Sequence, residues 1–139
     1  MREVVVLIVA ALLTACDVVT DHYATLTDAR ADSLFERGWL PDILPPSSHD
    51  IRTSNDVATN FSSGEFHFSP QEFPQLAASL RPYAQPKALT ELDNEVSQLT
   101  DRGFTPYEYT TADTVWLFLC DSSQGFCVYR MWPQLTTDV

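Results

Sequence analysis

Apolar side chains recur with the spacing of a helix in three parts of the chain. Between residues 24 and 37 they share one helical face, and Gly38 follows as a stop signal; the apolar positions are Ala24, Leu26, Ala31, Leu34 and Phe35. Residues 69–80 begin with Ser-Pro-Gln-Glu, which is typical of a capped helix start. Residues 90–102 also present one apolar face and end before Gly103; its members are Leu92, Val96 and Leu99. The pattern therefore predicts three helices.

Other parts of the chain alternate between apolar and polar positions, as strands do. Residues 51–57 and 65–68 alternate on either side of Ser-Ser-Gly at 62–64, which predicts a hairpin with its turn at that tripeptide. Residues 107–120 and 125–132 supply two or three further strands. The predicted fold class is α+β: a small antiparallel sheet built from hairpins, two or three packed helices and one disulfide.

Two cysteines flank the turn between the last two predicted strands. Cys120 and Cys127 are separated by turn-forming residues, so a disulfide between them would set the register of the hairpin. Phe118 would then face Tyr129, and Trp116 would face Met131, on the same side as the disulfide. The opposite side is almost as apolar; it carries Val115, Leu117, Leu119, Val128, Arg130 and Trp132. We expect such a hairpin to be buried on both faces, with a partly exposed binding surface as the alternative.

The chain opens with an apolar run from Val4 to Leu13, which is too short to span a bilayer and has the length of a signal-peptide core. The run ends in Leu13-Thr14-Ala15-Cys16, which resembles the lipobox of bacterial lipoproteins. The resemblance implies cleavage before Cys16 and attachment of lipid to its thiol. An ordinary secretory signal is the alternative. Asp17 resembles a signal for retention in the inner membrane, although inner and outer membrane both remain open.

This interpretation divides the chain into three parts. Residues 1–15 are the signal peptide, residues 16–23 are a lipidated tether without clear periodicity, and residues 24–139 form a single α+β domain. The expected location is the periplasmic face of the bacterial cell envelope, where the protein is held by its N-terminal lipid. Disulfides persist in that compartment, in keeping with the pairing of Cys120 with Cys127.

The charge narrows the range of partners. The chain carries 8 Lys and Arg against 19 Asp and Glu, a formal net charge of −11. No basic stripe is available to contact phosphates, so we expect no nucleic acid partner. An anionic membrane surface would repel the domain, which is therefore expected to stand off the bilayer. The acidity could serve solubility alone, or it could complement a basic protein partner.

The segment Gly-Trp-Leu-Pro-Asp-Ile-Leu-Pro-Pro at residues 38–46 is the most distinctive in the chain. Its three prolines exclude a regular helix, and its apolar residues are too numerous for a free linker. We expect it to be clamped across the domain with its large side chains inward. The motif resembles small bacterial secreted proteins and lipoproteins that have no assigned activity, over about residues 24–70.

No pattern in the sequence predicts catalysis, a metal or a cofactor. The histidines at 22, 49 and 67 lack the spacing of a ligand set, although His49-Asp50 could form half of one, and no Gly-x-Ser-x-Gly or glycine-rich phosphate loop occurs. Paired acids such as Glu91 with Asp93, or Asp113 with Asp121, are better explained as solvated positions. We therefore expect a protein that is not an enzyme and has neither catalytic nor metal-binding residues.

Protein recognition is the function that these exclusions leave. The candidate partner-binding residues are Trp39, Arg130 and Trp132, because aromatic and arginine anchors dominate interface energetics. One hypothesis is an immunity-type inhibitor of a secreted or periplasmic toxin or hydrolase. The alternative is an accessory or structural lipoprotein of envelope assembly, which could capture extended peptides along a strand edge.

Overall fold

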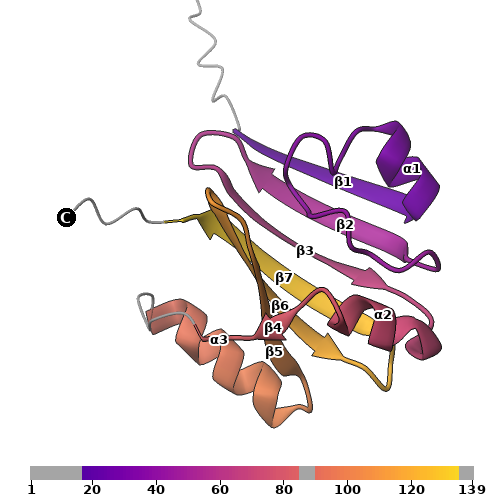
Figure 1. The fold of residues 1–139 in the computed structure, drawn as a ribbon. Helices are drawn as coiled ribbons and strands as arrows, with labels where there is room; N and C mark the ends of the chain where they lie inside the picture. Colours follow the sequence, from indigo (N-terminus) through magenta and orange to yellow (C-terminus); the bar gives the residue numbers. More distant parts are fainter. Residues whose placement is uncertain (1–16, 85–89, 135–139) are drawn as a thin grey trace, which may run out of the picture.

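A computed structural model describes residues 17–84 and 90–134 of the chain. It shows a seven-stranded antiparallel sheet in the order β1-β2-β3-β7-β6-β5-β4 (Figure 1). The strands are β1 (Val18–Thr25), β2 (His49–Asp56), β3 (Phe61–His67), β4 (Arg81–Pro82), β5 (Thr105–Thr110), β6 (Thr114–Asp121) and β7 (Phe126–Pro133). The pairing of β3 with β7 joins the strands of the first half of the chain to those of the second half.

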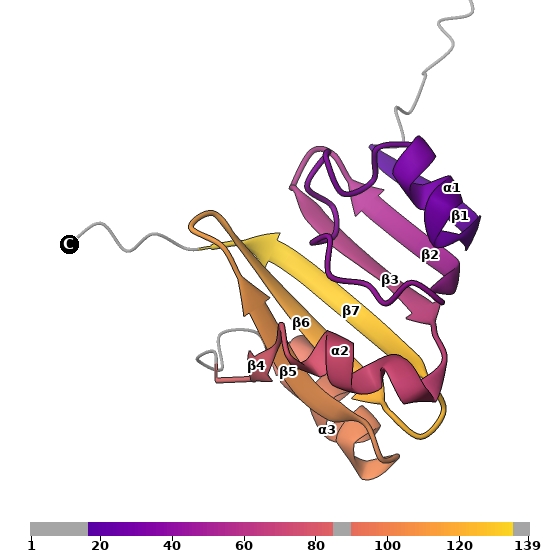
Figure 2. The same ribbon diagram turned by 45° about the vertical axis from the view of Figure 1, so that its right-hand side comes forward.

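The helices cover the two faces of this sheet unequally. They are α1 (Leu26–Ala31), α2 (Phe73–Ala77), preceded by a 3₁₀ turn at Pro70–Glu72, and α3 (Thr90–Asp101). Figures 1 and 2 show α1 and α2 on one face and α3 on the other. We call the first the inner face, because its strand residues Trp116, Phe118 and Tyr129 belong to the main core with Leu26 and Leu76 of the helices. The second is the outer face.

The predicted α+β class is wrong, because the sheet dominates and two of the three helices are very short. Helix α1 has 6 residues and α2 has 5, so only α3, with 12, is a helix of ordinary length. Leu34 lies beyond α1, and Ser33 has a φ of 57°, which ends helical geometry and turns the chain inward. In the sequence, Leu34 continues the apolar spacing of a helix. In the structure, the turn that follows α1 places the Leu34 side chain in the core.

Residues 18–23 are not a tether. They form most of β1, which pairs along its length with β2, from Val18 opposite Asp56 to Thr25 opposite His49. As an edge strand, β1 exposes most of its side chains and buries only Tyr23, so its sequence shows no clean alternation. The folded domain therefore begins before residue 24.

The predicted hairpin of residues 51–68 is confirmed as β2 and β3, although its turn lies elsewhere. The Asp56 carboxylate accepts hydrogen bonds from the backbone N–H groups of Ala58 (3.0 Å) and Thr59 (3.2 Å), which closes the turn before β3. Asn60 completes the turn with a φ of 58°. Ser62, Ser63 and Gly64, predicted as the turn, lie within β3.

The C-terminal hairpin has the predicted register. Cys120 faces Cys127 and forms a disulfide with it, Phe118 faces Tyr129, and Trp116 faces Met131. Strand β6 is buried on both faces, since Leu117 and Leu119 are as inaccessible on the outer face as Phe118 is on the inner one. The outer-face residues of β7 are half-buried.

The proline-rich segment lies across the inner face, as expected. Leu40 and Leu44 are buried in the core, and the Trp39 carbonyl accepts a hydrogen bond of 3.0 Å from the indole Nε1 of Trp116. The segment thus fills the space between α1 and α2 without regular secondary structure. Within the described residues, no helix has the length and apolar character needed to cross a membrane.

Candidate functional site

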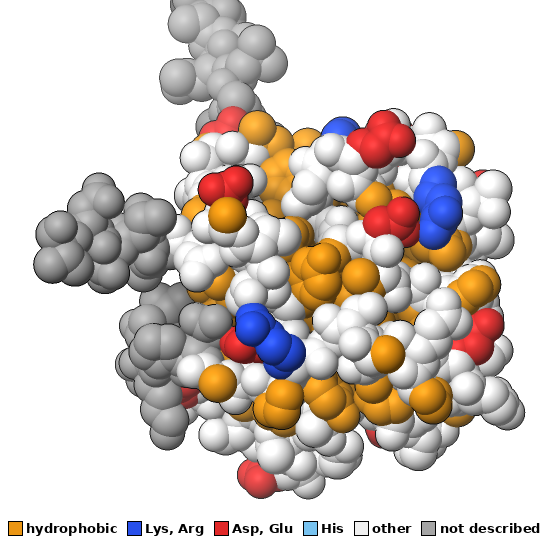
Figure 3. All heavy atoms as spheres, in the orientation of Figure 1, with side chains coloured by type: hydrophobic (Ala, Val, Ile, Leu, Met, Phe, Trp, Pro, Cys, Tyr) orange, Lys and Arg blue, Asp and Glu red, His pale blue; other side chains and the backbone are white. Residues whose placement is uncertain are grey.

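The inner face carries a band of apolar side chains that are only half-buried. We call this band the aromatic surface, because most of its members are aromatic; they are Phe35, Trp39, Ile43, Phe73, Leu80, Tyr107 and Tyr109. Figure 3 shows hydrophobic side chains gathered in the middle of this face, with acidic and basic groups around them. A wide apolar area of this kind with a charged surround is typical of a binding surface.

Ring contacts fix the aromatic surface in place. Phe73 of α2 packs against Tyr107 of β5 with ring centroids 5.9 Å apart, and Tyr109 meets Trp116 edge-on at 5.8 Å. Trp116 in turn holds the backbone of Trp39 through its indole hydrogen bond. The exposed parts of these side chains are therefore presented by a rigid underlying sheet, which lowers the entropic cost of binding a partner.

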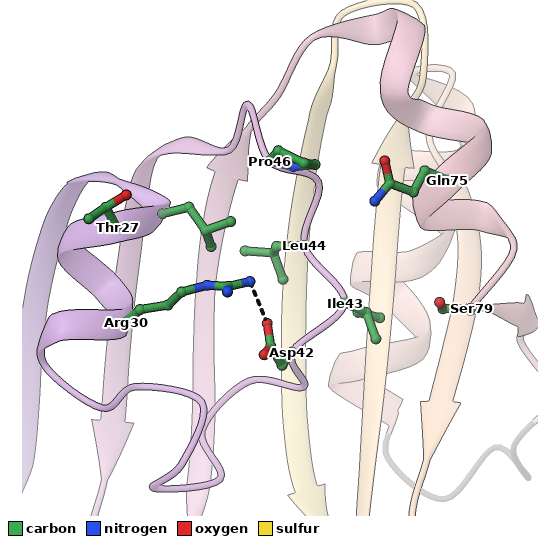
Figure 4. Close-up of a pocket in the computed structure, with 9 residues that line it drawn as sticks. Thr27, Arg30, Asp42, Ile43, Leu44, Pro46, Gln75 and Ser79 are labelled. Carbon is green, nitrogen blue, oxygen red and sulfur yellow. Dashed lines mark hydrogen bonds and ion pairs between the residues drawn. The ribbon is translucent and has the colours of Figure 1, made fainter.

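A cleft of about 530 Å³ opens between α1, the proline-rich segment and α2 (Figure 4). Leu26 and Leu44 line the cleft and are nearly inaccessible to solvent, so they form its floor. Arg30 and Asp42 point toward one another across one wall. Their side chains form an exposed ion pair at 2.9 Å. The complete lining of the cleft is Leu26, Thr27, Arg30, Asp42, Ile43, Leu44, Pro46, Gln75 and Ser79. An apolar floor with a charged rim can accept a protruding apolar or basic side chain.

Local hydrogen bonds explain why the proline-rich segment holds this shape. The Ser47 hydroxyl accepts from the Ser69 backbone N–H at 2.8 Å and donates to the Glu72 carboxylate, which also accepts from the Ser47 N–H at 3.0 Å. The sequence suggested that Ser69 and Glu72 form a capping box. The structure shows no side-chain cap at Ser69 and uses Glu72 to bind the proline-rich segment instead.

The structure does not bring the three candidate partner-binding residues together. Trp39 belongs to the aromatic surface, whereas Arg130 and Trp132 lie on the outer face beside α3. Arg130 forms an ion pair with Glu95 of α3 and donates to its neighbour's carbonyl at 2.8 Å. Trp132 lines a separate groove of about 270 Å³ together with Phe61 and Leu92. One compact interface could not use both tryptophans.

The remaining sequence candidates have different locations. Cys16 precedes the described residues, and Asp17 is exposed, with its carbonyl accepting from the Val57 N–H at 2.9 Å. Asp113 and Asp121 lie at opposite ends of β6 and do not form a pair. The side chain of Glu91 is outside the described part of the chain.

The three histidines come together around Asp50, which the sequence could not reveal because they lie on different strands. His22 Nε2 lies 3.1 Å from the Asp50 carboxylate, and the rings of His49 and His67 stack with centroids 5.7 Å apart. The hydrogen bond from His22 holds the pKa of Asp50 below its usual range. Within residues 17–84 and 90–134, no three His, Cys, Asp or Glu side chains are grouped to hold a metal ion.

Raising the pH above 10 is expected to destabilise the fold. Burial and a 2.5 Å hydrogen bond to Asp32 raise the pKa of Tyr23 from 10.0 to about 12, and burial raises the pKa of Tyr129 as well. The folded state holds both protons more tightly than the unfolded chain does. The contribution of these two tyrosines to stability is therefore fully present below pH 10 and is lost as the pH rises through their folded pKa values.

Urea unfolding measured at a series of alkaline pH values checks this expectation, with tyrosinate absorbance followed in parallel. The Tyr23→Phe variant serves as the control, since it should lose stability less steeply with pH than the unaltered protein. Equal slopes for the two proteins would contradict the assignment.

The fold and surface together define a small domain built on one antiparallel sheet, with a disulfide between β6 and β7 and a wide, half-buried apolar surface. Residues 17–67 match a family model described as the YbbD head domain. The match covers β1, α1, the proline-rich segment, β2 and β3, which is less than half of the chain, and the chain is similar to that domain over this range. No curated protein and no solved structure matches the chain.

Proposed function

We propose that this chain is a lipid-anchored protein of the bacterial cell envelope that acts by protein–protein recognition. The single observation that supports recognition most is the aromatic surface, which holds half-buried apolar rings on a rigid sheet beside a cleft. Interfaces draw much of their affinity from such aromatic anchors. The net charge of −11 favours a basic partner, and an immunity-type inhibitor of a secreted or periplasmic toxin or hydrolase combines these properties.

Anchoring is supported by Leu13-Thr14-Ala15-Cys16 and by the disulfide, which suits an oxidising compartment. The substitution Cys16→Ser removes the thiol that would carry the lipid. We expect it to abolish incorporation of labelled fatty acid and to move the protein out of the membrane fraction. The serine substitution keeps the size of the side chain. Unchanged fractionation and labelling would refute lipidation at this residue.

Recognition is tested first by affinity capture of the full-length lipidated protein from its own envelope, with cross-linking and mass spectrometry. Recovery of one basic toxin or hydrolase in stoichiometric amount supports the inhibitor role, and purified partner then allows an inhibition assay. Recovery of assembly components, or of nothing above background, would favour an accessory lipoprotein instead.

The two tryptophans then locate the interface, since they lie on opposite faces of the sheet. Trp39→Ala should weaken partner binding by about 30-fold, the effect of removing a central aromatic anchor, whereas Trp132→Ala should leave it unchanged. The Trp39 carbonyl that binds Trp116 is retained in the variant, so the segment should keep its place. Thermal unfolding of both variants checks folding, and the reverse order of effects would move the interface to the outer face.

An accessory role in envelope assembly is the second candidate, and the sheet edges favour it. The edge formed by β4 has only two residues and contains Pro82, but the edge formed by β1 extends over eight. Long edge strands can receive an additional strand from a partner peptide. Cross-links from captured peptides to β1 rather than to the aromatic surface would support this role.

A further inference from the structure

The exposed large hydrophobic residues of the described chain all lie at one end of the sheet. They are Val18, Val19, Val57 and Phe61, with exposed fractions of 42, 46, 62 and 46%. Val18 and Phe61 flank Asp56 on adjacent strands, and the Val57 N–H bonds to the Asp17 carbonyl at 2.9 Å. The start of β1 and the β2–β3 turn are therefore neighbours, as Figure 1 also shows. We call these four residues the apolar end.

The apolar end adjoins the residue proposed to carry the lipid. Cys16 immediately precedes Asp17, and β1 begins at Val18, so the Cα atoms of Cys16 and Val18 are separated by at most about 7 Å. The polar headgroup layer of one leaflet is about as thick as that distance. A domain attached through Cys16 could not stand off the bilayer on a tether, because residues 18–23 are committed to the sheet.

We propose that the apolar end is a membrane-contact surface, which lies in the interfacial layer of the bilayer and sets the orientation of the domain. This inference rests on the lipidation of Cys16 in the proposed function. The side chains of Val57 and Phe61 would lose contact with water there, and the removal of exposed apolar groups from water is favourable. The aromatic surface would then run along the length of the anchored sheet, and the β6–β7 turn at its opposite end would project into water.

The chemistry of the apolar end selects the kind of lipid surface. Asp17 and Asp56 are its charged neighbours in the sequence and the sheet, and the chain as a whole is strongly acidic. Anionic headgroups would repel both carboxylates, whereas zwitterionic headgroups offer a positive group to each. The fitting partner is therefore a bilayer rich in zwitterionic lipid.

Hydrogen exchange with mass spectrometry tests the proposal on full-length lipidated protein reconstituted into phosphatidylcholine vesicles. The reference is the unlipidated Cys16→Ser protein without vesicles. Amides of residues 57–61 should exchange about tenfold more slowly on the vesicles, while those of residues 122–125 in the opposite turn should not change. Phosphatidylglycerol-rich vesicles should reduce the protection. The double variant Val57→Ser with Phe61→Ser should stay anchored by its lipid and lose the protection.

The same sample separates the two ways in which the idea could fail. The mass of the N-terminal peptide reports whether Cys16 carries lipid, and an unmodified cysteine overturns the proposed anchoring itself. A lipidated protein whose residues 57–61 exchange at the reference rate overturns the membrane contact alone. Protection of residues 57–61 in the concentrated Cys16→Ser protein without vesicles would assign the surface to a second copy of the chain and also overturn the proposal.

Discussion

Replacing Gly64 by alanine should lower the free energy of unfolding by about 3 kcal/mol, because the new methyl group has no room. A Cβ atom at this position would lie 2.0 Å from the Arg52 carbonyl oxygen and 2.8 Å from Cε1 of Tyr129. Tyr129 crosses over the glycine in the neighbouring strand and is itself fully buried, so it cannot move aside. The backbone of two paired strands would have to separate.

Urea-induced unfolding of the purified protein measures this loss. The matched control is Gly38→Ala, where a Cβ atom would meet nothing within 4 Å and only the φ of 81° opposes a side chain. That strain should cost about 1 kcal/mol. If Gly64→Ala were no more destabilising than Gly38→Ala, this result would contradict the close packing of Tyr129 against Gly64.

Removing the disulfide should cost about 2.5 kcal/mol, the chain-entropy value for a loop of this length. In the double variant Cys120→Ala with Cys127→Ala, the loss arises mainly from the greater freedom of the unfolded chain. Both cysteines are buried on the inner face beside apolar groups, so alanine introduces no unsatisfied polar atom. The register of β6 with β7 should persist, because many further residue pairs hold it.

A reducing agent provides the control for this prediction. Unaltered protein should fall to the stability of the double variant when reduced, and the double variant should not respond. A stability that is insensitive to reduction in both proteins would show that the bond contributes nothing to the fold.

The features that could be predicted from sequence are those set by local chemistry. The register of the last hairpin follows from the positions of Cys120 and Cys127, since a strand pairing fixed at one point is fixed throughout. Helix α3 follows from its apolar spacing and from Gly103, whose φ of 97° ends it. The prolines at 41, 45 and 46 exclude regular structure and leave only a clamped segment.

The features that could not be predicted depend on partners distant in sequence. Strand β1 exists because β2 pairs with it, and its own side chains carry little information about burial. Helix α1 was predicted too long, because Leu34 satisfies a helical spacing although it is buried by a turn that follows the helix. Both errors shifted the fold class toward α+β and hid the extent of the sheet.

The candidate site was predictable only in part, for the same reason. Trp39 was a candidate because of its residue type, and the structure places it in the aromatic surface. Because successive side chains of a strand point to opposite faces, Trp132 must lie on the face opposite Met131. No local pattern shows which face of the sheet Trp39 packs against. The cleft has walls from three separate segments, and the histidines meet across strands, so neither can be read from spacing.

The position of β7 has a consequence for how the chain acquires its structure. It is the last strand along the described residues, yet it occupies the middle of the sheet, between β3 and β6. Until β7 joins the sheet, β3 is an unpaired edge strand and Phe66 lacks Cys127, its partner in the neighbouring strand. Such pairings between distant residues form slowly, because a long loop must close first. During synthesis, the first three strands must therefore wait with β3 unpaired, and a chaperone that shields that edge would protect the protein from aggregation.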